Sequence, residues 1–147
     1  VEPFRTIDDL FREAGIASEL TPDPRLSLWT KFIFICPAAS VTSLLKKSFG
    51  DVLDDPEARE MLVGMIGEVE QIARAKGIAL PTDIAAATLD KVRQFPPETK
   101  TSLQLDFEKG RETEIDTFTG FIVKSGRELG IATPLHDRAY GLLTTRG

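Results

Sequence analysis

The sequence predicts an all-α fold, a multi-helix bundle, on three observations. Apolar residues recur at spacings of three, four and seven in most segments, which is the period of a helix that buries one face. Residues that favour helix starts and stops bound these segments, as Asp55-Pro56 and Gly77 do. Only residues 16–20 alternate apolar and polar side chains in the way of a half-buried strand.

Length and charge restrict the class of protein. The 147 residues are 41% hydrophobic and 28% charged, which suits one globular domain with a full-sized core. The net charge is −5 and the basic runs are no longer than Lys46-Lys47, so we expect neither nucleic acid nor an acidic membrane surface as a partner. The densest apolar run, residues 32–39, is too short to span a bilayer, and the first residues do not resemble a signal peptide.

Single thiol and imidazole groups argue against a metal site. Cys36 is the only cysteine, so it forms no internal disulfide, and this fits a reducing cytoplasm. It lies in an apolar run without a neighbouring base, which predicts a buried, inert thiol. His136 stands alone and is expected at the surface or at a helix cap, and no metal-ligand spacing occurs.

The first residues predict a helix followed by a strand. Residues 6–15 form the helix, with Thr6 as cap and Gly15 as stop, and its apolar residues are expected to face inward: Ile7, Leu10 and Phe11. Residues 16–20 form the strand. A helix and a strand ahead of a helical domain indicate that residues 1–22 are the end of an upstream α/β domain.

The next helix starts at Pro24, with Asp23 as its cap, and is expected to kink or end at Pro37. A separate short helix is expected over residues 38–48, ended by Gly50. Lys31 is embedded in the apolar face of the first of these helices. Either it extends its ammonium group into water, or it is held at a cleft where desolvation lowers its pKa toward the range useful for proton transfer.

The longest helix is expected over residues 55–77. Gly64 and Gly67 are costly inside a helix and suggest that another helix or a ligand approaches closely. Glu68 is either an exposed helix former or a buried partner of a cation such as Lys31, and the sequence favours exposure.

Four more helices are expected in the C-terminal half, near 81–94, 99–109, 113–129 and 135–143. About seven helices then form the bundle, beside the N-terminal helix over 6–15. Thr113 and Asp116 resemble a capping box at the start of the helix over 113–129. Glu114 would then lie in its first turn, where the helix dipole favours the charged carboxylate. Capping alone explains such a residue at least as well as catalysis does.

Three segments in this order resemble the C-terminal domain of the ketopantoate reductase family, the 2-dehydropantoate 2-reductases: LWTKFIFICPA, EVEQIARAKG and TSLQLDFEKGRETEIDTFTGFIVKSGRELGIATPLHDRAYGLL. The resemblance implies that residues 23–147 are a helical substrate-binding and dimerisation domain of the 6-phosphogluconate dehydrogenase C-terminal-like type. It also implies that residues 1–22 end an NADP-binding Rossmann domain. The chain lacks the Gly-x-Gly-x-x-Gly motif, so NADPH would be bound mainly by that absent domain and this fragment alone is expected to be inactive.

The resemblance assigns roles to individual residues in the reduction of a 2-keto acid. Lys31 matches the family's catalytic lysine, which as general acid would protonate the carbonyl oxygen. Glu114 matches the active-site glutamate that would bind the substrate hydroxyl, and Ser102 matches a serine expected at the keto-acid end. Asp106 and Glu68 are expected to support the site without touching the substrate.

Two positions depart from the family pattern. The family usually has asparagines four and eight residues after the lysine, and here those positions are Ile35 and Ala39. Loss of the amides removes hydrogen bonds to a polar substrate, at about 1–3 kcal/mol for each group left unpaired. A less polar 2-keto acid than ketopantoate is therefore a serious alternative.

Two further interpretations stay open. The first is a non-catalytic helical domain derived from such a reductase, kept for association or for binding a small acid, and Ile35 and Ala39 motivate it. The second is a relative among the 6-phosphogluconate dehydrogenase-like β-hydroxyacid dehydrogenases, which ranks lower because Thr-Glu-Ile-Asp at 113–116 fits the ketopantoate reductase pattern better.

Overall fold

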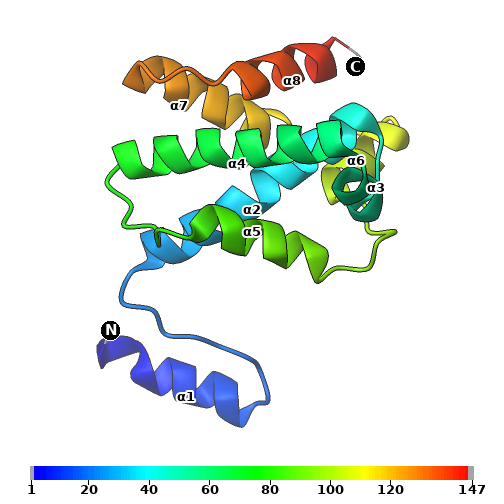
Figure 1. The fold of residues 1–147 in the computed structure, drawn as a ribbon. Helices are drawn as coiled ribbons and strands as arrows, with labels where there is room; N and C mark the ends of the chain where they lie inside the picture. The colour runs from blue at the N-terminus through cyan, green and yellow to red at the C-terminus, as the bar shows by residue number, and fades with distance from the viewer. Residues whose placement is uncertain (1, 146–147) are drawn as a thin grey trace.

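The computed structural model describes residues 2–145, which form a helical bundle without a strand (Figure 1). Its eight α-helices are α1 (Arg5–Glu13), α2 (Pro24–Leu45), α3 (Phe49–Asp54), α4 (Pro56–Ala75), α5 (Ile84–Arg93), α6 (Ser102–Glu108), α7 (Phe121–Leu129) and α8 (Pro134–Thr144). A 3-10 turn, η1 (Glu2–Phe4), precedes α1, and a π-helix, η2 (Asp116–Gly120), precedes α7. The predicted all-α bundle is confirmed.

Helix α2 is the longest, with 22 residues, and it continues through Pro37. Asp23 caps it as predicted, because its carboxylate accepts a hydrogen bond from the Leu26 amide at 3.0 Å. The expected end at Pro37 is wrong, as is the separate helix over 38–48. Proline inside a helix costs about 3 kcal/mol, and the packing of α2 from Cys36 to Leu44, where every residue is buried, outweighs that cost. Gly50 lies inside α3 instead of ending a helix.

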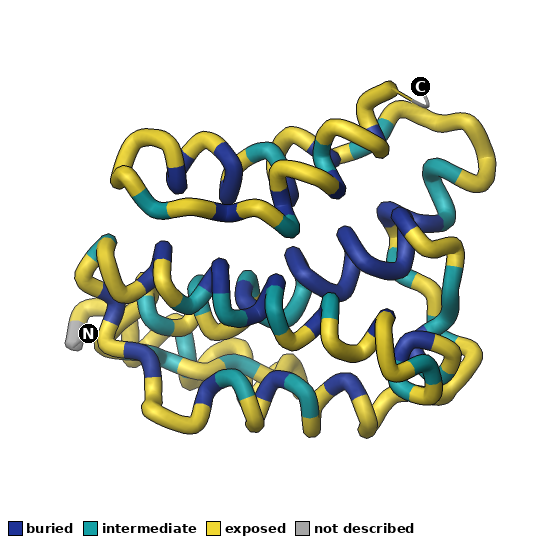
Figure 2. Tube along the Cα trace, turned by 45° about the horizontal axis from the view of Figure 1, so that its top comes forward, coloured by how far each residue is buried: buried dark blue, intermediate teal, exposed yellow. Residues whose placement is uncertain are grey.

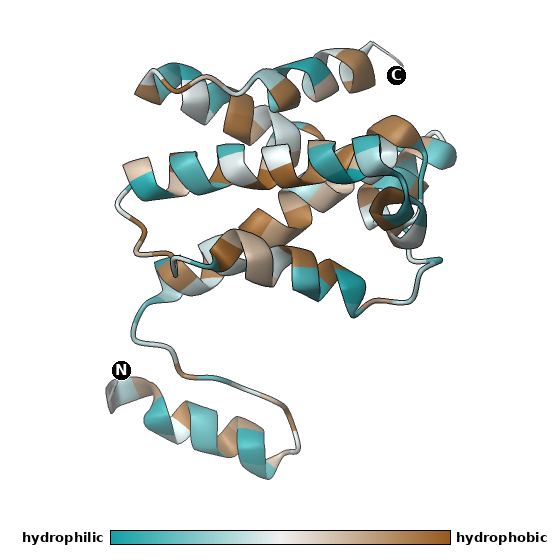
Figure 3. Ribbon diagram, viewed as in Figure 1, coloured by the Kyte–Doolittle hydropathy of each residue, from teal (hydrophilic) through white to brown (hydrophobic). Residues whose placement is uncertain are grey.

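Five of the other helices pack around α2. It contacts α3, α4, α5, α6, α8 and η2, and ten of its residues are buried. By length and composition alone α2 could also cross a membrane, with a mean hydropathy of 1.5. Burial within the bundle accounts for that hydropathy, and apolar residues colour much of α2 brown in Figure 3. Every residue of the buried core lies between Ile33 and Leu143, so the bundle builds its core without α1 (Figure 2).

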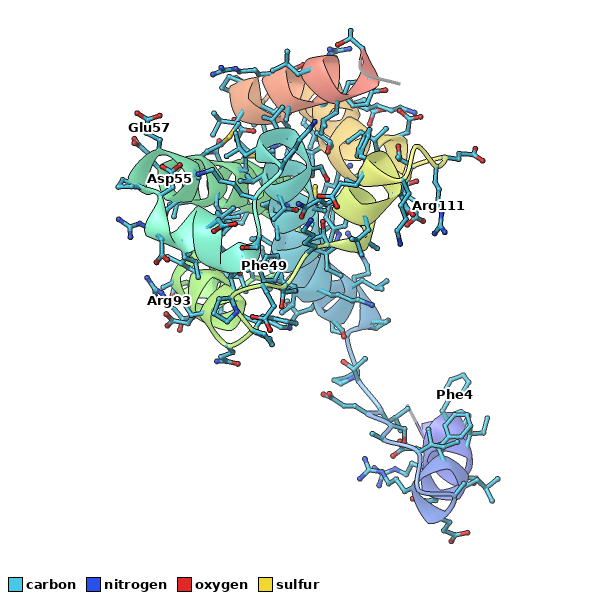
Figure 4. All side chains as sticks on the ribbon, turned by 90° about the vertical axis from the view of Figure 1, so that its right-hand side faces the viewer. Phe4, Phe49, Asp55, Glu57, Arg93 and Arg111 are labelled. Atoms are coloured by element: carbon cyan, nitrogen blue, oxygen red, sulfur yellow. The ribbon has the colours of Figure 1, made fainter. Side chains whose placement is uncertain are left out.

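Helix α1 stands apart from the bundle, joined to it by an extended linker (Figure 1). Figure 4 shows Phe4 on this separate segment. The prediction that the apolar side chains of α1 face inward is wrong within the described residues. These side chains are 45–58% exposed: Ile7, Leu10 and Phe11. Residues 16–20 form no strand, because none of residues 2–145 offers them a strand to pair with. Thr6 is not the cap either, since α1 begins at Arg5 and is continuous with η1.

Side-chain caps fix several helix starts. Asp55 caps α4 as predicted, and it accepts from the amides of Glu57 and Ala58 (Figure 4). Ser48 and Asp51 form a capping box at α3 that the sequence analysis did not identify. These caps order the loops at one end of the bundle.

Candidate functional site

Lys31 and Ile35 lie one turn apart on α2 and border the same groove. The groove encloses about 590 Å³, and the linker before α2 and the end of α5 complete its wall through Thr21, Lys91 and Phe95. Ala39, two turns beyond Lys31, is 2% exposed and lies in the core. Of the two apolar positions that depart from the family pattern, only Ile35 therefore borders the groove.

The Lys31 side chain is exposed and has no ion pair among residues 2–145. This agrees with the interpretation in which the ammonium group extends into water. Desolvation at a cleft is not seen in the part of the chain that the structure describes.

Ser102 is the exposed first residue of α6, and its neighbour anchors it. Thr101 caps α6 by accepting from the Gln104 amide, and its hydroxyl lies 2.9 Å from the hydroxyl of Thr42 on α2. The start of α6 is therefore fixed to α2.

Glu114 lies two residues before η2 and is exposed. Its carbonyl oxygen accepts from the Phe118 amide at 3.1 Å, whereas its carboxylate has no partner among residues 2–145. The expected capping box of Thr113 and Asp116 does not form. The Asp116 carboxylate instead accepts a hydrogen bond from the Tyr140 hydroxyl at 2.5 Å, which raises the pKa of Tyr140.

Two contacts hold η2 against α2. The ring of Phe118 stacks on that of Phe32 with centroids 6.3 Å apart. The hydroxyls of Thr119 and Ser40 lie 2.7 Å apart, and both side chains are fully buried. The segment that carries Glu114 is thereby docked on the helix that carries Lys31.

Asp106 stabilises the turn between α6 and the Glu114 segment. The Arg111 amide donates to the Asp106 carbonyl at 2.9 Å, and their side chains form an ion pair at 3.8 Å. Gly110 supports the same turn, because its φ of +62° suits glycine.

Glu68 is buried, which contradicts the expected exposure, and its partner is His136 instead of Lys31. One carboxylate oxygen lies 2.6 Å from His136 Nδ1 and 3.1 Å from the His136 amide, and the other accepts from the Leu135 amide at 2.8 Å. His136 is 0% exposed, so the expected surface position is wrong. A carboxylate on α4 thus caps the N-terminus of α8, and the Thr-Pro pair at 133–134 was the only sequence signal of that helix start.

Cys36 is buried as predicted. Its sulfur lies 3.7 Å from His136 Nε2, and burial raises the pKa of the thiol, so the nucleophilic thiolate is disfavoured. Within residues 2–145, no cluster of three metal-ligating side chains occurs.

Lys31 lies on α2, Ser102 on α6 and Glu114 just before η2, and both α6 and η2 pack on α2. No hydrogen bond or ion pair joins the three side chains to one another among residues 2–145. Each of the three side chains is exposed, and Lys31 is the one of them that lines the groove on α2.

A model of a known protein family, "Ketopantoate reductase PanE/ApbA C terminal", matches residues 23–146. The chain belongs to the ketopantoate reductase family. Its relatives include the 2-dehydropantoate 2-reductases of Caulobacter vibrioides, 30% identical over 91% of this chain and 46% of that protein, and of Archaeoglobus fulgidus, 27% identical over 85% of this chain and 42% of that protein. The chain spans about half the length of the curated relatives it matches.

Solved structures of the ketopantoate reductase family share the fold. The enzyme of Ralstonia eutropha superposes with a TM-score of 0.88 at 26% identity, over 97% of this chain and 47% of that one. A D-mandelate dehydrogenase superposes with a TM-score of 0.86 over 99% of this chain and 48% of that one, at 20% identity, which shows the shared fold alone.

Proposed function

We propose that this chain is the C-terminal half of an NADPH-dependent 2-keto acid reductase. Residues 23–147 would be its substrate-binding and dimerisation domain, and residues 1–22 the end of its Rossmann domain. The relatives are about twice as long as this chain, which leaves room for that domain. The uncovered apolar side chains of α1 also support the proposal, because an upstream domain would bury them.

The observation that carries the proposal is the exposed Lys31 beside a groove on α2, in a chain of the ketopantoate reductase family. As general acid, its ammonium group would donate a proton to the carbonyl oxygen of the substrate. The same positive charge would stabilise the alkoxide as it develops. This chain offers no glycine-rich phosphate loop, and NADPH, held mainly by the upstream half, would supply the hydride.

Glu114 and Ser102 would orient the substrate. The Glu114 carboxylate is unpaired among residues 2–145 and would accept a hydrogen bond from a substrate hydroxyl. The Ser102 hydroxyl, at the start of α6, would donate to the keto-acid end. Asp106 and Glu68 would act indirectly, Asp106 by holding the turn before Glu114 and Glu68 by fixing α8.

The groove favours a substrate less polar than ketopantoate. Ile35 presents an aliphatic side chain one turn from Lys31, where an amide would hydrogen-bond a hydroxyl. The fold also occurs in a D-mandelate dehydrogenase, so it does not by itself fix the substrate.

The full-length protein tests this function in an assay of NADPH oxidation with ketopantoate and a panel of aliphatic and aromatic 2-keto acids. We expect turnover, with kcat/KM higher for an apolar 2-keto acid than for ketopantoate. Equal or better turnover of ketopantoate would contradict the role given to Ile35, whereas the absence of any turnover would contradict the enzymatic function.

A second candidate is a non-catalytic domain that binds a small acid or mediates association. The apolar residues at 35 and 39 favour it, because they remove polar groups that the family usually has. It predicts a ligand-induced rise in Tm without NADPH oxidation, which the same protein samples would show.

The proposal includes a cytoplasmic homodimer formed through the helical domain. Light scattering of the full-length protein gives the test, and a mass of one subunit would contradict it.

A further inference from the structure

Thr119 makes a buried hydrogen bond across the interface of η2 and α2. Its hydroxyl lies 2.7 Å from that of Ser40, and both residues are 0% exposed. Ser40 has one hydroxyl hydrogen and donates it to the Cys36 carbonyl at 2.8 Å. Thr119 is therefore the donor to Ser40.

The helix that contains Thr119 is of an uncommon kind. In η2 the Gly120 amide donates to the carbonyl of Ile115, five residues earlier, at 3.0 Å. Single π-turns of this type insert one extra residue into a helix and recur at functional sites. Helix η2 begins two residues after Glu114, so its register determines where the Glu114 backbone leaves the bundle.

Contacts on two sides define that register. On α2, the Phe118 ring stacks on Phe32, the neighbour of Lys31, and on α8 the Tyr140 hydroxyl donates to Asp116. Stacked rings tolerate sliding because their attraction varies slowly with offset. A hydroxyl-to-hydroxyl bond is directional and weakens steeply when its angle or distance changes. On the α2 side, the bond from Thr119 is therefore the contact that fixes η2 along the helix axis.

We propose that Thr119 is a positioning residue, which through Ser40 holds η2 on α2 and so sets the Glu114 carboxylate relative to the Lys31 ammonium group. The inference rests on the proposed function. Misplacing a catalytic group by about 1 Å can cost up to about a hundredfold in rate. Thr119 would thus affect turnover although it touches neither substrate nor cofactor.

The test measures kcat and KM of the full-length protein with NADPH and its best 2-keto acid. Thr119→Val removes the donor at nearly constant volume, Thr119→Ser keeps it, and Thr117→Val changes an exposed residue of the same π-helix. We expect kcat/KM to fall about tenfold for Thr119→Val. It should stay within about twofold of wild type for Thr119→Ser and for Thr117→Val.

A second set of variants separates positioning from loss of stability. If Thr119 acts through Glu114, the double variant Thr119→Val with Glu114→Gln is no slower than Glu114→Gln alone. A purely structural role would lower the Tm and the active fraction, and the two losses would multiply. The inference would be overturned if the losses of kcat/KM in the two single variants multiply in the double variant, or if Thr119→Val leaves kcat/KM unchanged. In either case the proposed function would still stand, provided that Glu114→Gln is impaired. A wild type that oxidises no NADPH with any 2-keto acid would overturn both.

Discussion

The carboxylate of Glu68, on α4, accepts a hydrogen bond from His136 Nδ1 at 2.6 Å and also caps the helix that carries His136. A helix start normally uses the residue before its first turn as cap. At α8 that residue is Thr133, and its hydroxyl donates to Asp137 instead. The orphan amides of α8 are therefore satisfied by a side chain from another helix, which joins α4 to α8 in the core.

Replacing Glu68 by glutamine should destabilise the bundle. The amide nitrogen of glutamine would face the donors of Leu135 or His136, and buried donors would lose their acceptor. We expect the free energy of unfolding to fall by about 2–4 kcal/mol. Urea unfolding followed by circular dichroism measures it, with Glu60→Gln on the exposed face of α4 as control. A loss no greater than that of the control would contradict the capping role.

The two glycines of α4 should respond differently to alanine. A Cβ at Gly64 would lie 2.5 Å from Leu135 Cδ1, whereas a Cβ at Gly67 would meet no atom within 4 Å. Gly67→Ala should raise the unfolding free energy by about 0.5–1 kcal/mol. Gly64→Ala should lose that gain because Leu135 must move. Equal Tm shifts for the two variants would show that the contact with Leu135 is unimportant.

Removing the hydroxyl of Ser43 should cost nothing. Its Oγ is buried without a hydrogen-bond partner among residues 2–145. Ser43→Ala removes an unsatisfied polar atom, so stability should stay constant or rise by up to about 1 kcal/mol. Ser40→Ala, three residues earlier on α2, loses two hydrogen bonds and should lower the Tm. A clear loss in Ser43→Ala would indicate a partner that the structure does not show.

Asp55 should make the start of α4 sensitive to acid. Its hydrogen bond with Lys47 and those from the amides it caps hold the pKa of the carboxyl below its usual range. A lowered folded pKa gives stability that is complete above the unfolded pKa of about 3.9 and is lost as the pH falls through the folded value. Asp55→Asn keeps the cap but removes the charge, so its Tm should fall less than that of wild type between about pH 6 and pH 3. An equal fall of Tm in wild type and Asp55→Asn would contradict the Asp55 charge as the origin of the acid sensitivity. Asp54→Asn is the matched control.

Local signals predicted most of the fold correctly. Asp23 and Asp55 cap the helices that the sequence analysis assigned to them, because a cap depends on residues only two or three positions away. The end of the helix at Pro37, one of the two alternatives expected there, is wrong for the opposite reason. Tertiary packing of α2 outweighs the local cost of proline, and periodicity in one segment does not report that packing.

The prediction of the site was limited because several of its contacts join residues that are far apart in the sequence. Glu68 and His136 are 68 residues apart, and Ser40 and Thr119 are 79 apart. Spacing within a helix cannot identify such pairs. The roles of Lys31, Ser102 and Glu114 were assigned from a family resemblance for the same reason. The structure places Lys31 on α2 and the other two on segments that pack against α2.

The most direct test of the account is NADPH oxidation by the full-length protein and its Lys31→Ala variant, with the best 2-keto acid of the panel as substrate. Lys124→Ala, an exposed lysine on α7, is the control. If Lys31 is the general acid, kcat should fall by about a hundredfold or more in Lys31→Ala and stay unchanged in the control. Equal kcat values in wild type and Lys31→Ala would contradict the proposed mechanism.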